Sequence, residues 1–398
     1  MGYYNKPHSG RRRSYTNSKP NKRGGRKHGQ YIDPSRFVKQ ANPVTHEEYL
    51  ATHDFSDFNL NPLIVKNLAS KGYVTPSPVQ DQTIPHILDH KDIIGIAATG
   101  TGKTGAFAIP VLHKLLTSAH SKALIVAPTR ELAQQIYAEC HSIAKGADID
   151  AAILIGGSSM GPQLRDLKAK PSIVIGTPGR IKDHLERKTL RLETFNTVVL
   201  DEVDRMLDMG FVHDITIILS HLADKRQSLF FSATLDKRVN DLISTFSHEP
   251  ITIKLKNNEA SANVHQDVVK VSSSSDKLDA LHNLLIEPDK IKKAILFDET
   301  QRRVERLQQS LTQRGFNVEA IHGGKSQGQR MRALKKFKDN DVNILVATDV
   351  AARGIDIIDV THVINYSVPQ TYEDYIHRIG RTGRAGQTGY ALTFIDNK

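Results

Sequence analysis

From about residue 92 onward, short apolar runs alternate with longer amphipathic stretches whose apolar positions recur with a helical period. Such alternation is typical of βα units, in which crossover helices join buried parallel strands. A first series of strands is predicted at residues 92–97, 123–127, 151–155, 172–175, 197–200, 228–231 and 251–253. The alternation pauses at residues 256–264, which are polar and lack periodicity. A second series is predicted at residues 268–271, 294–297, 318–321, 343–347, 362–365 and 390–394.

The two series predict an α/β protein with two doubly wound parallel-sheet domains in tandem. Domain 1 is expected at residues 46–255, a linker at 256–264 and domain 2 at 265–398. A chain of 398 residues is long enough for two domains that each bury their own core. Ligands of such sheets bind beyond the carboxyl ends of the strands, so the chemistry is expected at that edge.

The formal charge of +11 is concentrated at the start of the chain. Nine of the 54 basic residues lie in residues 1–30, whereas all 43 acidic residues lie later. Because this basic segment has almost no aliphatic side chains to bury, we expect a disordered tail over residues 1–45. Its charge favours an arm that holds RNA by phosphate attraction. A solubilising leader and a localisation patch are the alternatives.

Composition argues against several classes of protein. No apolar run approaches the ~18 to 20 residues of a membrane-spanning helix, and none follows the basic start as in a secretory signal. Cys140 is the single cysteine, which excludes an intramolecular disulfide and a cysteine-built zinc site. We therefore expect a cytoplasmic protein without membrane contact. As a separate expectation, the chain is a monomer.

The strongest local signal is a glycine-rich turn between a predicted strand and an apolar helix start. Its glycines allow backbone N–H groups to close around phosphate oxygens, Lys103 adds a point charge, and the Thr104 hydroxyl suits Mg²⁺. Ala97 stands where the first glycine of such loops is usual, so a chance glycine-rich turn is the alternative. The turn predicts a site for ATP and Mg²⁺ formed by Ala98, Thr99, Gly100, Thr101, Gly102, Lys103 and Thr104.

A second signal is the pair Asp201-Glu202 at the end of a predicted strand. Asp201 is expected to hold Mg²⁺, and Glu202 to orient and deprotonate the attacking water. The alternative is a purely structural role as an acidic helix N-cap. A phosphate loop followed about a hundred residues later by a strand-end Asp-Glu pair indicates the nucleotide and metal site of P-loop ATPases.

Further short motifs occur in a set order. The first half contains Pro128-Thr129-Arg130-Glu131-Leu132, Gly156-Gly157, Thr177-Pro178-Gly179-Arg180, Asp201-Glu202-Val203-Asp204 and Ser232-Ala233-Thr234. The second half contains His322-Gly323 with Gln327 and Arg330, then residues 347–356 and 377–384. In this order they resemble the motifs of DEAD-box ATP-dependent RNA helicases with a bacterial-type core, from about Phe55 to the C-terminus. Val203 replaces the alanine that names the family, and we expect only a packing adjustment there.

The resemblance implies two RecA-like domains and RNA-stimulated ATP hydrolysis with ATP and Mg²⁺. It further implies unwinding or remodelling of RNA duplexes and RNA–protein complexes, with RNA and ribonucleoproteins as partners. The implied catalytic residues are Lys103, Asp201, Glu202, Arg381 and Arg384, the two arginines acting on the γ-phosphate. Further nucleotide contacts are implied for Phe55, Tyr73, Gln80, Gly354 and Asp356.

The resemblance also implies roles in RNA binding and in domain coupling. Sequence-independent RNA backbone contacts are implied for Thr129, Arg130, Gly157, Thr177, Arg180, Gln327, Arg330 and Thr348. Coupling between the domains is implied for Asp204, Ser232, Thr234 and His377. Taken singly, Tyr73 and Gln80 could pack a helix-turn, and the arginines could be ordinary surface residues.

Three other functions use some of the same motifs. A DNA-translocating helicase shares the two-domain plan, and an ATP-gated RNA clamp would have the same motifs without unwinding. A P-loop kinase or GTPase leaves the second domain unexplained, and the Gln80 amide suits adenine better than guanine.

Overall fold

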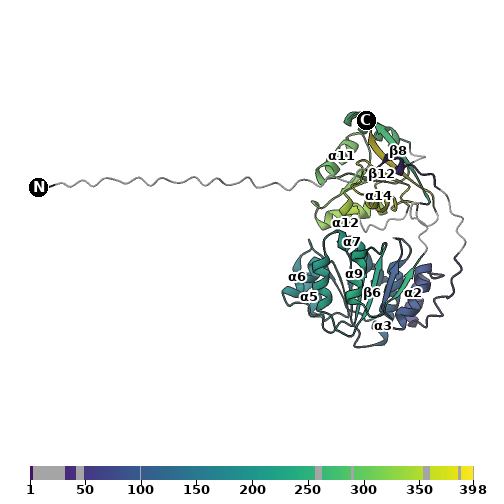
Figure 1. The fold of residues 1–398 in the computed structure, drawn as a ribbon, viewed down its shortest axis with the longest axis vertical. Helices are drawn as coiled ribbons and strands as arrows, with labels where there is room; N and C mark the ends of the chain where they lie inside the picture. The colour runs from purple at the N-terminus through teal and green to yellow at the C-terminus, as the bar shows by residue number, and fades with distance from the viewer. Residues whose placement is uncertain are drawn as a thin grey trace.

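The computed structural model describes residues 1–2, 32–41, 49–98, 100–255, 262–287, 291–352, 359–383 and 387–397. Six features of the sequence prediction lie outside these residues: most of the basic tail, most of the linker, Thr99, Gly354, Asp356 and Arg384. Figure 1 shows two lobes stacked along the long axis, which we call lobe 1 (residues 49–255, below) and lobe 2 (residues 262–397, above).

Lobe 1 is built around a seven-stranded parallel sheet with the order β3-β4-β2-β5-β6-β1-β7. Its strands are β1 (Ile93–Ile96), β2 (Ala123–Val126), β3 (Ala151–Leu154), β4 (Ile173–Gly176), β5 (Thr197–Asp201), β6 (Gln227–Ser232) and β7 (Ile251–Lys254). Its helices are α1 (Pro62–Ser70), α2 (Pro78–Leu88), α3 (Lys103–Thr117), α4 (Arg130–Ile143), α5 (Met160–Lys168), α6 (Pro178–Glu186), α7 (Val203–Asp208), α8 (Val212–Ser220) and α9 (Lys237–Phe246).

Both faces of this sheet are covered by helices, which explains why its strands are continuous apolar runs. In β5, Val199 packs into the core cluster on one face, whereas Val198 and Leu200 pack into the cluster on the other. Val203 is fully buried in the second cluster, as expected for a packing position. No helix in the described residues is long and apolar enough to cross a membrane.

Lobe 2 contains a six-stranded parallel sheet with the order β10-β11-β9-β12-β13-β8. Its strands are β8 (Val264–Val271), β9 (Ala294–Phe297), β10 (Val318–Ile321), β11 (Ile344–Ala347), β12 (His362–Asn365) and β13 (Gly389–Asp396). Its helices are α10 (Ser274–Leu285), α11 (Gln301–Gln313), α12 (Gln327–Lys338), α13 (Asp349–Ala352) and α14 (Tyr372–Ile379). Every predicted strand is confirmed. The largest difference is β8, which begins four residues before its predicted start, at the end of the predicted linker.

The prediction of a disordered tail up to residue 45 is wrong for residues 32–41. A short helix, η1 (Pro34–Phe37), forms there, and Phe37 is fully buried against lobe 2. Figure 1 shows this dark purple segment beside β8. Composition underestimated its order because the surface that buries Phe37 comes from residues more than two hundred positions later.

Candidate active site

The glycine-rich turn links the end of β1 to the start of α3. Gly100 has φ of +82° and Gly102 has φ of +94°, backbone conformations that favour glycine. A Cβ atom on Gly102 would lie 2.6 Å from Ser77 Oγ and 2.8 Å from Gln80 Nε2. Glycine is therefore required at Gly102 both for its backbone conformation and for the close approach of α2. The helix N-terminus at Lys103 leaves backbone N–H groups available to an anion.

Buried charges gather beside this turn. The Lys103 side chain is buried, and its Nζ donates to the Ala97 carbonyl at 2.9 Å. Asp201 ends β5, and burial raises the pKa of its carboxyl to about 6 although Lys103 acts in the opposite direction. A divalent cation would compensate this buried carboxylate, and Thr104 supplies a hydroxyl at the start of the neighbouring helix. The residues present thus fit the predicted Mg²⁺.

Glu202 is held in an unusual conformation. It adopts the left-handed region at φ +54°, ψ +54°, a strained geometry that clusters at functional sites. Its Oε2 accepts a hydrogen bond from Arg205 Nη1 at 2.7 Å. Burial alone would raise the pKa of Glu202, but Arg205 and Lys103 outweigh burial and lower it to about 2. The carboxylate is thus ionised and oriented, although its partnership with Arg205 weakens it as a base.

A cavity of about 540 Å³ lies over these groups and is lined by both lobes. Lobe 1 contributes Lys71, Tyr73, Gly100, Gly102, Lys103, Thr104, Gly105, Leu132, Gln135, Ala138, Glu139, Asp201 and Glu202. Lobe 2 contributes Lys338 and Arg381. Arg381 therefore reaches the same cavity as Lys103. Together they supply positive charge from both lobes, as binding of a nucleoside triphosphate requires.

The residues predicted to contact adenine lie together at one side of the cavity, in a region that we call the adenine corner. Tyr73 lines the cavity, donates its hydroxyl to Glu139 Oε1 at 2.8 Å, and packs edge-on against Phe55. Phe55 is buried behind Tyr73 and supports it from within the core. Gln80 lies behind Gly102: its Nε2 donates to the Gly102 carbonyl at 3.1 Å, and its Oε1 accepts from the Ser77 N–H at 3.0 Å. Gln80 is buried and is not among the residues that line the cavity, so its contact with adenine remains a prediction.

The predicted coupling residues meet at the seam between the lobes. Asp204 Oδ2 accepts from the N–H groups of Ala233 and Thr234, at 3.1 and 2.9 Å, and from Thr234 Oγ1 at 3.0 Å. Ser232 Oγ contacts the Asp204 N–H at 3.3 Å. His377 of lobe 2 is half-buried near them. Burial first, and then Arg205, lower the pKa of His377 to about 4, so its ring is neutral near pH 7.

The predicted RNA-contact residues of lobe 1 cluster beyond the carboxyl ends of β2, β3 and β4. Thr129 caps α4, accepting from the Leu132 N–H at 3.2 Å. Arg130 lies over Gly157, where a Cβ atom would overlap its guanidinium. Arg180 Nη1 donates to the Ser158 carbonyl at 3.3 Å, and Thr177 precedes the same helix as Arg180. The structure thus brings all five lobe 1 residues to one edge.

In lobe 2 the structure gives two of these residues a partner that the sequence did not predict. Gln327 Nε2 donates to Glu131 Oε1 at 3.0 Å and to Gln134 Oε1 at 3.0 Å. Arg330 Nη2 lies 2.9 Å from Glu131 Oε2. Their side chains bridge the lobes, and RNA contact remains a prediction for them and for the buried Thr348. Glu131 belongs to a motif used for the resemblance, but no role was assigned to it.

Comparisons with known protein families agree with this geometry. Residues 77–242 match the family model described as DEAD/DEAH box helicase, and residues 276–386 match the helicase conserved C-terminal domain. The chain is 47% identical over 344 residues to the ATP-dependent RNA helicase CshA of Listeria monocytogenes, covering 86% of this chain and 66% of that protein. It is 47% identical over 347 residues to the DEAD-box ATP-dependent RNA helicase CshA of Bacillus subtilis, covering 86% and 70%. The chain thus spans about two thirds of the length of these relatives.

Solved structures compare in overall shape as well as in sequence. S. cerevisiae Dbp5 bound to RNA and ADP BeF3 matches with a TM-score of 0.77 at 29% identity, over 87% of this chain and 90% of that one. Mss116p bound to ssRNA and AMP-PNP matches with a TM-score of 0.78 at 33% identity, over 86% and 74%. A DEAD box protein from Methanococcus jannaschii reaches only 0.51 despite 38% identity, over 86% and 93%.

The higher TM-scores at lower sequence identity indicate that the lobes are placed relative to one another as in the two RNA-bound and nucleotide-bound structures. The resemblance inferred from the sequence is confirmed by two domain matches in the expected order and by high identity over most of the chain. The chain belongs to the DEAD-box ATP-dependent RNA helicase family.

Proposed function

We propose that this chain hydrolyses ATP in the cavity between its lobes when RNA is bound. Closure and reopening of the lobes then unwind or remodel RNA duplexes and RNA–protein complexes. The observation that carries this proposal is that Lys103 of lobe 1 and Arg381 of lobe 2 line one cavity. A phosphoryl group held there meets positive charge from both lobes only while they are closed.

Each side chain has a distinct task in this cycle. Lys103 and the backbone N–H groups at the start of α3 hold the phosphates, and Glu202 positions the attacking water. Thr104 and Asp201 would hold Mg²⁺, which supplies charge that neutralises the phosphate oxygens. Arg381 stabilises the charge that develops during phosphoryl transfer. Arg384 is proposed to act beside it and lies outside the described residues.

RNA is proposed to bind along the edge formed by Thr129, Arg130, Gly157, Thr177 and Arg180, and to continue onto lobe 2. Hydroxyl, guanidinium and backbone N–H donors recognise phosphate and sugar, so binding is independent of sequence. Because ATP and RNA each contact both lobes, each ligand favours the closed state and strengthens binding of the other. We further propose a cytoplasmic monomer that acts on ribonucleoprotein partners.

The decisive experiment is Arg381→Ala. We expect RNA-stimulated ATP turnover to fall about a thousandfold, because a guanidinium at the phosphate contributes mainly to the transition state. ATP binding, measured by fluorescence titration, should change little. Arg302→Ala, at an exposed position on α11, is the matched control and should retain RNA stimulation. Full turnover by Arg381→Ala would contradict the proposal.

A strand-displacement assay tests the mechanical step separately. The wild-type chain should release a short strand from an RNA duplex in the presence of ATP, and an RNA oligomer should compete better than DNA of equal length. Hydrolysis without strand release would favour an ATP-gated clamp.

A further inference from the structure

Residues 32–41 dock on lobe 2, although lobe 1 follows them in the sequence. Asp33 caps η1 by accepting from the Ser35 N–H at 2.9 Å. Phe37 is fully buried with its ring centroid 4.7 Å from that of Tyr375, and it belongs to the core cluster of lobe 2. The Arg36 guanidinium stacks over the Tyr372 ring at 3.7 Å. This is specific packing, with a buried aromatic anchor.

Backbone pairing extends the docked segment along the edge of the lobe 2 sheet. Lys39 forms an antiparallel bridge with Gln266 of the edge strand β8, through hydrogen bonds of 3.0 and 2.8 Å. The Ala41 N–H donates to His265 Nδ1 at 3.2 Å. The segment thereby covers part of an otherwise open strand edge.

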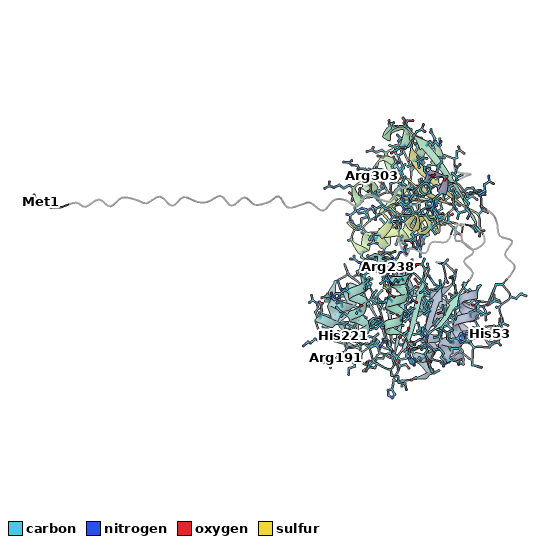
Figure 2. The ribbon with its side chains drawn as sticks, viewed as in Figure 1. Met1, His53, Arg191, His221, Arg238 and Arg303 are labelled. Carbon is cyan, nitrogen blue, oxygen red and sulfur yellow. The ribbon has the colours of Figure 1, made fainter. Side chains whose placement is uncertain are left out.

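A second anchor holds the first residues of lobe 1 against α2. The carboxylate of Asp81, which is 2% exposed, accepts from the Tyr49 hydroxyl at 2.6 Å and from the Thr52 N–H at 2.8 Å. His53 contributes its own N–H at 3.2 Å and a ring nitrogen at 2.6 Å. Figure 2 places His53 on the flank of lobe 1. Asp81 directly follows Gln80 on α2, so this second anchor adjoins the adenine corner.

Both anchors lie on elements that border the linker between the lobes. The linker reaches lobe 2 at the start of β8, where Gln266 and His265 receive the docked segment. It leaves lobe 1 from β7, which packs against α2, the helix that carries Asp81. Only residues 42–48 separate Ala41 from Tyr49, which limits their separation to roughly 29 Å even when fully extended.

We propose that the chain makes a second connection between the lobes, which we call the N-terminal strap, because residues 32–41 are anchored at Phe37 on lobe 2 and residues 49–53 are held at Asp81 on lobe 1. A single linker allows the two lobes to swivel as well as open. Two neighbouring connections resist the swivel and keep the lobes near their closing orientation. The strap thereby reduces the conformational entropy lost when ATP and RNA close the lobes, which raises the affinity for both ligands.

Cutting the strap distinguishes two explanations: the connection restrains the lobes, or residues 32–41 only pack on lobe 2. A protease site placed within residues 43–47 of the full chain allows the connection to be cut while both anchors stay intact. Fluorophores on Glu193→Cys and Arg306→Cys, exposed positions in lobes 1 and 2, report lobe separation by single-molecule energy transfer.

After cutting, we expect the ligand-free distribution of lobe separations to broaden. Half-saturating ATP and RNA concentrations should rise about tenfold, while turnover at saturation stays within about twofold, because only closure is affected. Unchanged distributions and half-saturation after cutting would overturn the proposal and leave residues 32–41 as packing for lobe 2. The ligand-free measurement does not depend on the proposed ATPase activity, so the two proposals fail separately.

Point variants and a second cut provide the controls. Phe37→Ala should reproduce the effect of cutting, whereas Val38→Ala, at an exposed neighbour, should not. Tyr49→Phe removes the hydroxyl contact to Asp81 and should give a smaller effect in the same direction. A cut placed just before Ile32 removes the basic segment and leaves both anchors, so lobe separation should stay that of the intact chain. Broadening after that cut would also contradict a role for the anchors.

Discussion

Gly157 meets two requirements at once, because its φ is +74° and the Arg130 guanidinium lies where a Cβ atom would be. We expect Gly157→Ala to destabilise the chain by about 1–3 kcal/mol, through backbone strain and displacement of Arg130. RNA affinity should fall as well, because Arg130 is moved from the proposed RNA edge. Thermal unfolding and RNA titration measure the two effects.

Gly161→Ala is the matched control for this glycine. A Cβ atom at Gly161 would meet nothing within 4 Å, and the position lies inside α5, where alanine is favoured over glycine. It should leave RNA binding unchanged and stability equal or slightly higher. Equal effects of the two substitutions on stability and RNA affinity would contradict the proposed strain and steric overlap at Gly157.

His362 predicts a dependence of stability on pH. Burial lowers the pKa of this histidine to about 4, and its ring stacks on Tyr390. The unfolded chain binds a proton near the ordinary value of about 6.5, while the folded chain does not, so stability is lost as pH falls from 6.5 towards 4. The contribution is up to about 3 kcal/mol.

The measurement compares urea unfolding at pH 7.5 and pH 4.5. His362→Gln should lose less stability between these pH values than the wild-type chain does. His213→Gln, at an exposed position on α8, should lose as much as wild type. A wild-type loss retained in His362→Gln would show that the buried ring is not responsible.

At the scale of elements, the start of α7 holds the turn that follows β6. Asp204 accepts three hydrogen bonds from residues 233–234 on one oxygen and one from the Arg205 N–H on the other. Asp204→Asn replaces an acceptor with a donor, so at least one set of these contacts is lost, at about 1–3 kcal/mol. We expect ATP binding to persist while RNA stimulation falls about tenfold. Asp208→Asn, on the same helix but at an exposed ion pair with Arg238, is the control.

The bounds of a strand could be predicted from the sequence where the strand is buried along its whole length. β9, β10 and β12 coincide with their predicted bounds because each is buried along nearly its whole length. β8 is an edge strand with mixed burial, so its first four residues lacked a continuous apolar signal and were left out of the predicted strand. Residues 32–41 were missed for a related reason, since Phe37 lies in a short, mostly polar stretch and is buried only when lobe 2 covers it.

At the scale of the whole molecule, one carboxylate connects the lobes. Glu131 receives Gln327 and Arg330 from lobe 2, and all three side chains are buried. Glu131→Gln would leave the Arg330 charge without its carboxylate in the closed state, a loss of about 3 kcal/mol that the open state avoids through hydration. We expect half-saturating concentrations of ATP and RNA to rise together.

A double-mutant cycle with Arg330→Met tests this coupling. The paired substitutions should be less harmful than the sum of the single ones, because removing both charges leaves neither unpaired. Glu186→Gln, at an exposed position on α6, should behave as wild type. Additive effects in the cycle would indicate that the two residues act independently.

The sequence alone determined the chemistry and the order of the parts. The turn at Gly100 and Gly102, the carboxylates after β5 and the alternating apolar runs are local signals, because they depend on neighbouring residues and on the conformations those residues allow. Only the tertiary structure decided that Arg381 shares a cavity with Lys103, that Gln327 and Arg330 contact Glu131, and that Phe37 anchors on lobe 2. These contacts join residues far apart in the chain, and their free energy comes from surfaces that exist only after both lobes have folded.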